Sequence, residues 1–120
     1  MSARHLILVG LMGAGKTTVG AECARRLGRP FVDTDDVIVK TAGQRVDELF
    51  ASAGEQGFRR IEQDVVADVC ASPEPRVIAC GGGAVPDADN RHALRGAGLV
   101  VWLHAPAATL AGHVGDETGR

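Results

Sequence analysis

The chain has 120 residues, which suffices for one domain with a single hydrophobic core. Its formal net charge of -2 argues against nucleic acid as the main partner, because proteins that bind nucleic acid usually present a basic surface. The first apolar run, residues 6–9, is too short for a signal peptide or a membrane span. The 3 cysteines are widely separated and favour reduced thiols over a disulfide framework or a zinc site. We therefore expect a cytoplasmic protein with no membrane partner.

Short apolar runs alternate with helical patterns along the chain. Strands are expected at residues 6–9, 31–32, 76–80 and 99–103. Helices are expected at residues 16–27, 46–50, 58–69 and 87–95, with Gly54 and Gly57 separating the second from the third, Gly98 ending the fourth, and a last helix opening at Pro106. This alternation predicts an α/β fold in which helices cover both faces of a parallel sheet.

Residues 10–17, Gly-Leu-Met-Gly-Ala-Gly-Lys-Thr, match the P-loop pattern G-x-x-x-x-G-K-[ST] at every fixed position. The glycines let backbone N–H groups surround a phosphate, and the following helix adds the positive end of its dipole. An apolar strand before the pattern and an amphipathic helix after it favour this function over a glycine-rich turn with an ordinary surface lysine. We expect a P-loop NTPase-type three-layer fold. The residues expected to bind the nucleotide are Gly13, Ala14, Gly15, Lys16, Thr17 and Thr18, with Thr17 also a ligand of Mg²⁺.

Three further clusters stand at strand ends or share a helix. The acidic segment 33–36 ends the second strand, where a carboxylate could cap a helix or orient an attacking hydroxyl. Arg59 and Glu62 can pair on one helix, as a solvated salt bridge or as a site for a carboxylate or phosphate. The glycines 81–83 form either a tight turn or a place where a ligand approaches the backbone. Ligands gather at the carboxyl ends of parallel strands, so residues 10–18, 33–36 and 81–83 should meet at one edge.

In combination these segments resemble the shikimate kinases over nearly the full length of the chain. The matching stretches are GLMGAGKTT at 10–18, FVDTD at 31–35, GE-x-x-FRR-x-E at 54–62 and GGGAV at 81–85. Many nucleotide kinases share the first stretch, whereas the ordered set of the other three is far more specific. The resemblance implies transfer of the γ-phosphate of ATP to the 3-hydroxyl of shikimate, a step of aromatic amino-acid biosynthesis, with Mg²⁺.

On the nucleotide side, Lys16 of the P-loop can bridge the terminal phosphate oxygens and is expected to be a catalytic residue. The resemblance assigns roles to two residues outside this loop. Asp33 would support the magnesium shell together with Thr17. Arg120 would reach the transferring phosphates from the start of the family's mobile lid.

On the substrate side, the resemblance implies that Asp35 binds the hydroxyls of shikimate and orients the attacking one. Arg59 would hold the shikimate carboxylate, with Glu62 fixing its rotamer. Gly82 and Gly83 would present backbone N–H groups to the substrate. The apolar side of the ring would lie against two aromatic side chains, Phe50 and Phe58.

The chain departs from the family at its end, because the rest of the lid, a further strand and the closing helices do not follow Arg120. Residues 1–120 are therefore expected to be a single P-loop kinase domain that is incomplete at its C-terminus. Two other interpretations stay open: a catalytically impaired or non-catalytic nucleotide-binding relative, and assembly with a partner that supplies the missing strand. We expect a complete enzyme to be a monomer, whereas an exposed sheet edge would favour self-association.

Overall fold

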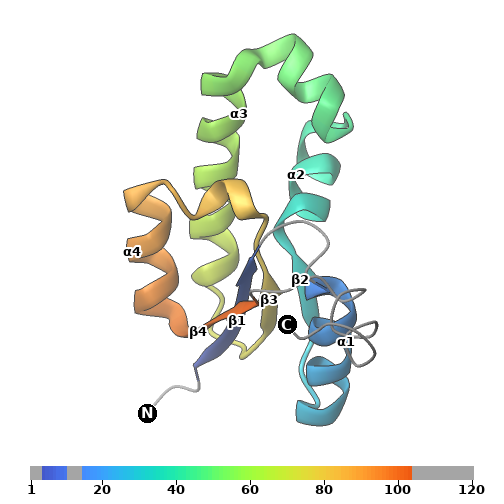
Figure 1. The fold of residues 1–120 in the computed structure, drawn as a ribbon, viewed down its shortest axis with the longest axis vertical. Coiled ribbons are helices and arrows are strands. Elements are labelled where there is room, and N and C mark those ends of the chain that lie inside the picture. The colour runs from blue at the N-terminus through green and yellow to red at the C-terminus, as the bar shows by residue number, and fades with distance from the viewer. Residues whose placement is uncertain (1–3, 11–14, 104–120) are drawn as a thin grey trace, which may run out of the picture.

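A computed structural model describes residues 4–10 and 15–103, and at its centre lies a four-stranded sheet (Figure 1). Its strands are β1 (His5–Gly10), β2 (Phe31–Asp33), β3 (Val77–Ala79) and β4 (Gly98–Leu103). They lie in the order β2-β3-β1-β4, and all neighbouring pairs are parallel. The predicted parallel sheet is confirmed, and each strand falls close to its expected bounds.

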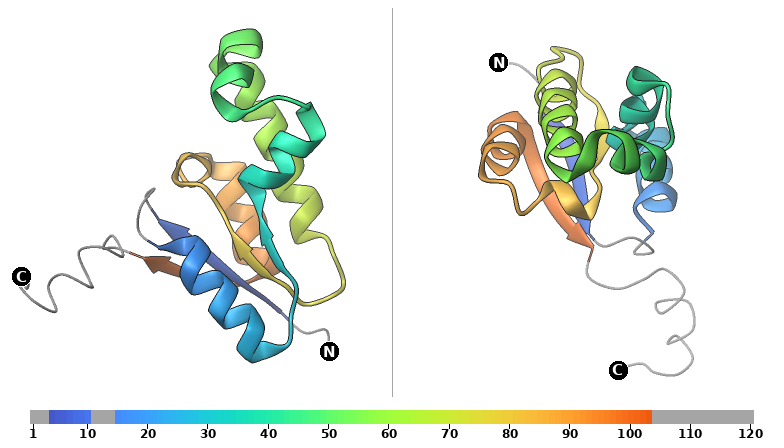
Figure 2. Two further views of the ribbon diagram at one scale, coloured as in Figure 1. Left: turned by 90° about the vertical axis from the view of Figure 1, so that its right-hand side faces the viewer. Right: turned by 90° about the horizontal axis from the view of Figure 1, so that it is seen from above.

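Helices cover both faces of this sheet (Figure 2). They are α1 (Lys16–Leu27), α2 (Thr34–Ala42), α3 (Val46–Cys70) and α4 (Ala88–Ala97). On one face, Leu8 of β1 packs with Ala24 of α1. On the other face, Val9 lies in a larger cluster with Val66 of α3 and Leu94 of α4. The side chains of β1 alternate between the two faces, as expected for a central strand buried in a three-layer P-loop fold.

Helix α2 is absent from the sequence prediction, which assigned residues 33–36 only as an acidic strand end. Asp33 caps this helix, since its side chain accepts a hydrogen bond from the backbone N–H of Asp35. Gly43 ends it in a left-handed conformation, with φ of 70°. Ile38 is fully buried and fixes α2 to the core. Together with the first half of α3, α2 extends beyond the carboxyl ends of the strands (Figure 1).

The structure confirms one of the two predicted helix breaks in α3. Gly54 interrupts the helix with φ of 77° and ψ of 173°, and α3 changes direction there. Gly57, by contrast, lies within the helix. The prediction of a break at Gly57 was therefore wrong, because the non-helical backbone angles within α3 are those of Gly54.

β4 forms one edge of the described sheet and is apolar over its whole length. Leu99 is 62% exposed and Trp102 is 51% exposed, so this edge carries large hydrophobic side chains in contact with solvent. The α4–β4 boundary lies at Gly98, as predicted. The helix expected from Pro106 lies outside the described residues. Within the described ranges, no helix is both long and apolar enough to cross a membrane.

Candidate active site

The three segments that follow strands meet at the carboxyl edge of the sheet, as predicted. They line one cavity of about 460 Å³, and α3 supplies its remaining wall. The strand ends contribute residues 15–18, Asp33, Asp35, Gly81 and Gly83. The end of the P-loop segment, two carboxylates and a glycine turn therefore border the same space.

The end of the P-loop leads directly into α1 at this cavity. Gly15 has φ of 87°, a left-handed conformation that favours glycine, and its carbonyl accepts from the N–H of Val19 at 2.8 Å. Thr17 and Thr18 in the first helical turn line the cavity. The first N–H groups of a helix have no partner within it, so this end can bind an anion.

The ammonium group of Lys16 lies beside the carboxyl end of β1. Its Nζ donates to the carbonyl oxygen of Gly10 at 2.9 Å, which keeps the cation beside the end of β1. The other predicted phosphate ligands of the loop, Gly13 and Ala14, lie outside the described residues, as does Arg120.

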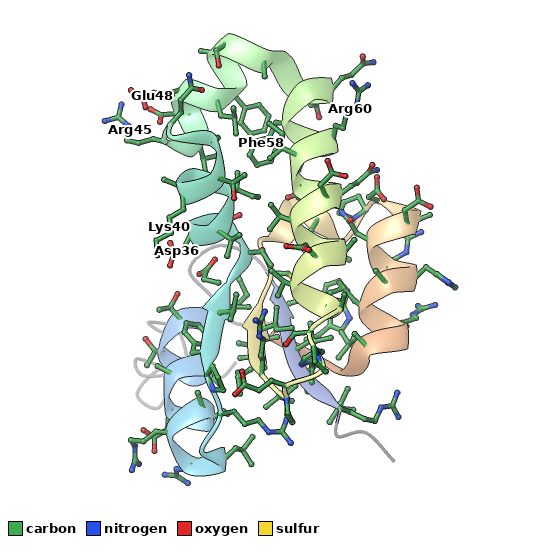
Figure 3. All side chains as sticks on the ribbon, turned by 180° about the vertical axis from the view of Figure 1, so that it is seen from behind. Asp36, Lys40, Arg45, Glu48, Phe58 and Arg60 are labelled. Atoms are coloured by element: carbon green, nitrogen blue, oxygen red, sulfur yellow. The ribbon has the colours of Figure 1, made fainter. Side chains whose placement is uncertain are left out.

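Asp33 and Asp35 stand where β2 gives way to α2. Oδ1 of Asp33 accepts from the N–H of Asp35 at 2.9 Å, so Asp33 is both a helix cap and a wall of the cavity. Burial raises the pKa of Asp35, and the charge of Asp33 raises it further, while Lys16 opposes the shift. A carboxylate with a raised pKa is a better proton acceptor. The next acidic residue, Asp36, is exposed on α2 and takes no part in the cavity (Figure 3).

Arg59 enters the cavity from α3 and is held on two sides. Its Nη1 donates to Oε1 of Glu62 at 3.0 Å and to the carbonyl oxygen of Gly83 at 3.1 Å. Glu62 is only 3% exposed, and burial raises the pKa of its carboxyl group although Arg59 opposes the shift. The pair is therefore not a solvated salt bridge. The following residue, Arg60, is exposed and points outward from α3 (Figure 3).

Two aromatic side chains form the apolar wall of the cavity, as predicted. Phe50 and Phe58 stack with their ring centroids 4.3 Å apart and an interplanar angle of 22°. The guanidinium carbon of Arg59 lies 5.8 Å from the Phe50 centroid and 5.3 Å from that of Phe58. Such cation–π contacts restrict the guanidinium plane without neutralising its charge.

The glycine segment 81–83 forms a tight turn, and the side chains of Arg59 and Asp35 lie close to its backbone. Residues Gly82–Ala84 form one 3-10 turn, closed by a hydrogen bond from Ala84 N–H to the Gly81 carbonyl at 3.1 Å. A Cβ atom at Gly83 would lie 2.6 Å from Nη1 of Arg59, and one at Gly81 would lie 3.0 Å from Oδ2 of Asp35. A side chain at either position would therefore displace the cation or the carboxylate of the site from where it now lies.

Comparison with known proteins identifies the group to which this arrangement belongs. The family model described as "Shikimate kinase" matches residues 12–120. The chain belongs to the shikimate kinase family. The shikimate kinase of Symbiobacterium thermophilum is 55% identical over 106 residues, which are 88% of this chain and 60% of that protein. The shikimate kinase of Pseudomonas syringae pv. syringae is 45% identical over 117 residues, covering 98% and 67% of the two chains.

Solved structures agree with this family assignment. A shikimate kinase from Acinetobacter baumannii in complex with shikimate superposes with a TM-score of 0.82 at 43% identity, covering 86% of this chain and 57% of that one. A gluconokinase from Sinorhizobium meliloti, 24% identical with a TM-score of 0.58, shares the fold alone. The chain spans about 60% of the length of the first curated relative that it matches.

Sequence reasoning missed the residues behind the glycine turn of this shikimate kinase homologue. Asn90 is 2% exposed and donates to the Ala84 carbonyl, while Gln63 of α3 donates to Asp87. The only signal was that Asp87 precedes a helix, which is typical of a cap. Val46, which also lines the cavity, carried no signal at all.

Proposed function

We propose that the protein transfers the γ-phosphoryl group of ATP to the 3-hydroxyl of shikimate, giving shikimate 3-phosphate and ADP. The observation that carries this proposal is the shared cavity of Lys16, Asp35 and Arg59, in which Arg59 is held between Glu62 and Gly83. A small cyclic acid with several hydroxyls needs one cation, hydroxyl acceptors and an apolar wall. Family membership and the relative solved in complex with shikimate support the same substrate.

Shikimate would bind through its carboxylate and its hydroxyls at opposite ends of the cavity. Arg59 would receive the carboxylate, since a guanidinium can donate two parallel hydrogen bonds to it. The N–H groups of Gly82 and Gly83 would add donors, and the stacked phenylalanines would cover one side of the ring. In this orientation the 3-hydroxyl of shikimate would face Asp35 and the P-loop.

In the transfer step, the oxygen of the 3-hydroxyl forms a bond to the γ-phosphorus of ATP. The bond from that phosphorus to the β–γ bridging oxygen breaks, and ADP leaves. Asp35 accepts the hydroxyl proton, a role that its raised pKa favours. Lys16, the loop residues Gly13, Ala14 and Gly15, and the first-turn hydroxyls of Thr17 and Thr18 would hold the phosphates, with Arg120 as a further cation.

We propose Mg²⁺ as the cofactor, and the donors present fit it. Thr17 and Asp33 both line the cavity and offer oxygen atoms, the ligand type that Mg²⁺ prefers. The described residues contain no cluster of three or more His, Cys, Asp or Glu able to hold a metal. This suits an ion bound through few protein ligands, water and phosphates. When bound, Mg²⁺ would neutralise charge on the β- and γ-phosphate oxygens.

We also propose that the enzyme acts in the cytoplasm, as a monomer in its complete form. All three cysteines are free thiols, which supports a reducing compartment. The apolar β4 edge supports self-association of residues 1–120 when they are produced alone. Sedimentation velocity at several concentrations distinguishes the two states.

The direct test is identification of the product. Purified protein is incubated with ATP, Mg²⁺ and shikimate, and the phosphorylated product is located by ³¹P NMR and mass spectrometry. A phosphate ester at the 3-position supports the proposal, with gluconate as the control substrate that should stay unmodified. Nucleotide binding without any phosphorylated shikimate would instead support a non-catalytic nucleotide-binding relative.

A further inference from the structure

Asn90 lies behind the active site and is almost completely buried. It belongs to the first turn of α4, is 2% exposed, and donates from Nδ2 to the carbonyl oxygen of Ala84 at 3.1 Å. The same oxygen accepts from the N–H of Asp87 at 3.3 Å. A buried amide is costly unless it is hydrogen-bonded, so this contact fixes Ala84 at the end of the glycine turn.

A second contact ties the start of α4 to α3. Nε2 of Gln63 donates to Oδ2 of Asp87 at 2.6 Å, and Oδ1 of Asp87 accepts from the N–H of Asn90 at 3.0 Å. Gln63 lies one helical turn after Arg59 on α3, and Arg59 donates to the Gly83 carbonyl. The contacts form a closed ring: Arg59, the glycine turn, Asn90, Asp87, Gln63 and back to Arg59.

The glycine turn depends on hydrogen bonds from neighbouring residues because its glycines have no side chains of their own. Gly81, Gly82 and Gly83 carry no side chains that could pack against the core, and glycine has the greatest backbone freedom. β3 holds the turn at one end, and Ala84, which is fully buried, holds it at the other. The position of the Gly83 carbonyl group relative to the guanidinium of Arg59 therefore depends on where Ala84 is held.

We propose that Asn90 is a positioning residue for the active site. By holding Ala84, it sets the place at which Gly83 meets Arg59, and so the affinity of Arg59 for a substrate carboxylate. This proposal rests on the proposed function as far as the substrate is concerned. It predicts a selective effect on the acid substrate, because the P-loop lies on β1 and α1, outside the ring.

The test uses Asn90→Leu, which keeps the number and branching of the side-chain heavy atoms but removes the donor, and measures two quantities. Amide hydrogen exchange of residues 81–85 without ligand should accelerate about tenfold, the size expected for one buried hydrogen bond. Shikimate affinity measured by calorimetry should weaken by about the same factor, while ATP affinity stays unchanged. Unchanged exchange in the turn, or equal weakening for both ligands, would overturn the proposal.

A second variant keeps the test decisive if Asn90→Leu does not fold. Gln63→Ala opens the ring at a half-buried position on α3, and the exposed neighbour Asp64→Ala is its matched control. Gln63→Ala should raise exchange in the turn and weaken shikimate binding, whereas Asp64→Ala should change neither. If wild-type protein itself fails to bind shikimate, the proposed function and the effect on affinity both fall. The exchange measurement then still decides whether Asn90 anchors the turn.

Discussion

The guanidinium of Arg59 donates to the carboxylate of Glu62 at 3.0 Å, and the two side chains differ sharply in exposure. Glu62 is 3% exposed, whereas the side chain of Arg59 is 33% exposed and borders the cavity. A buried carboxylate therefore orients a cation that remains open to a ligand. An exposed pair of this kind would contribute little, so its burial is what makes the arrangement specific.

Replacing Glu62 with Gln should weaken shikimate binding without affecting ATP. Gln keeps the shape but removes the charge that orients Arg59, and a hydrogen bond between charged groups contributes about 1.5–3 kcal/mol. We expect the KM for shikimate to rise at least about tenfold, which corresponds to about 1.4 kcal/mol. Steady-state kinetics with each substrate varied in turn checks this. An equal rise in the KM for ATP would contradict the role given to Glu62.

The free energy of unfolding should decrease with rising pH, because two carboxyl groups have raised pKa values in the native state. Burial raises the pKa of both Glu62 and Asp35, so the native state binds these protons more tightly than the unfolded chain. The free energy of unfolding should therefore fall as pH rises from the ordinary glutamate pKa of 4.5 through the native values, and then level off. Urea denaturation at closely spaced pH values checks this.

The same experiment on Glu62→Gln and Asp35→Asn provides the comparison. Each variant removes one of the groups whose protonation differs between the two states. The fall in stability with rising pH should be shallower in each than in wild type. A wild-type stability that instead rises over this range, with no change in either variant, would show that neither carboxylate has a raised pKa.

Gly83→Ala should damage the site, whereas Gly96→Ala should stabilise the protein. A methyl group at Gly83 would lie 2.6 Å from Nη1 of Arg59 and would displace it, while nothing lies within 4 Å of one at Gly96 in α4. Alanine at Gly96 should add about 0.4–1 kcal/mol to the free energy of unfolding. Gly83→Ala should raise the KM for shikimate; an unchanged KM would mean that Arg59 does not bind the substrate from this position.

His5 should stabilise the fold without contributing to the chemistry. Its ring is 4% exposed; Nδ1 accepts from the Arg76 N–H at 3.0 Å, and Nε2 lies 3.2 Å from the Cys70 carbonyl oxygen. His5→Phe keeps a ring but leaves these two backbone groups unpaired, at a cost of about 2–3 kcal/mol in unfolding free energy. The exposed His92→Phe is the control and should change little. Thermal and urea denaturation measure both variants.

Sequence patterns predicted those parts of the site that depend on the order of residues along the chain. The P-loop, Asp35 and the glycine turn each follow an apolar strand, and parallel strands bring their carboxyl ends together. The pairing of Arg59 with Glu62 follows from helical spacing. The burial of individual side chains could not be predicted from the sequence. Only the packed structure shows that Glu62 is buried and that Arg60 is exposed.

The failures also have physical causes. α2 was missed because Asp33-Thr34-Asp35-Asp36 indicates a turn or a site as well as a helix cap, and the helix forms because Ile38 is buried against the core. Asn90 was missed because its role depends on a carbonyl group, which every residue carries. Unlike a helix cap, a contact from a side chain to a carbonyl group six residues earlier has no characteristic pattern of residue types.

The most direct test of the account is ADP formation by the purified protein with ATP and Mg²⁺, with and without shikimate, beside Lys16→Ala. We predict that shikimate increases ADP formation and that Lys16→Ala abolishes the increase. ADP formation that is independent of shikimate, or equal in the variant, would contradict the proposal that this cavity phosphorylates shikimate.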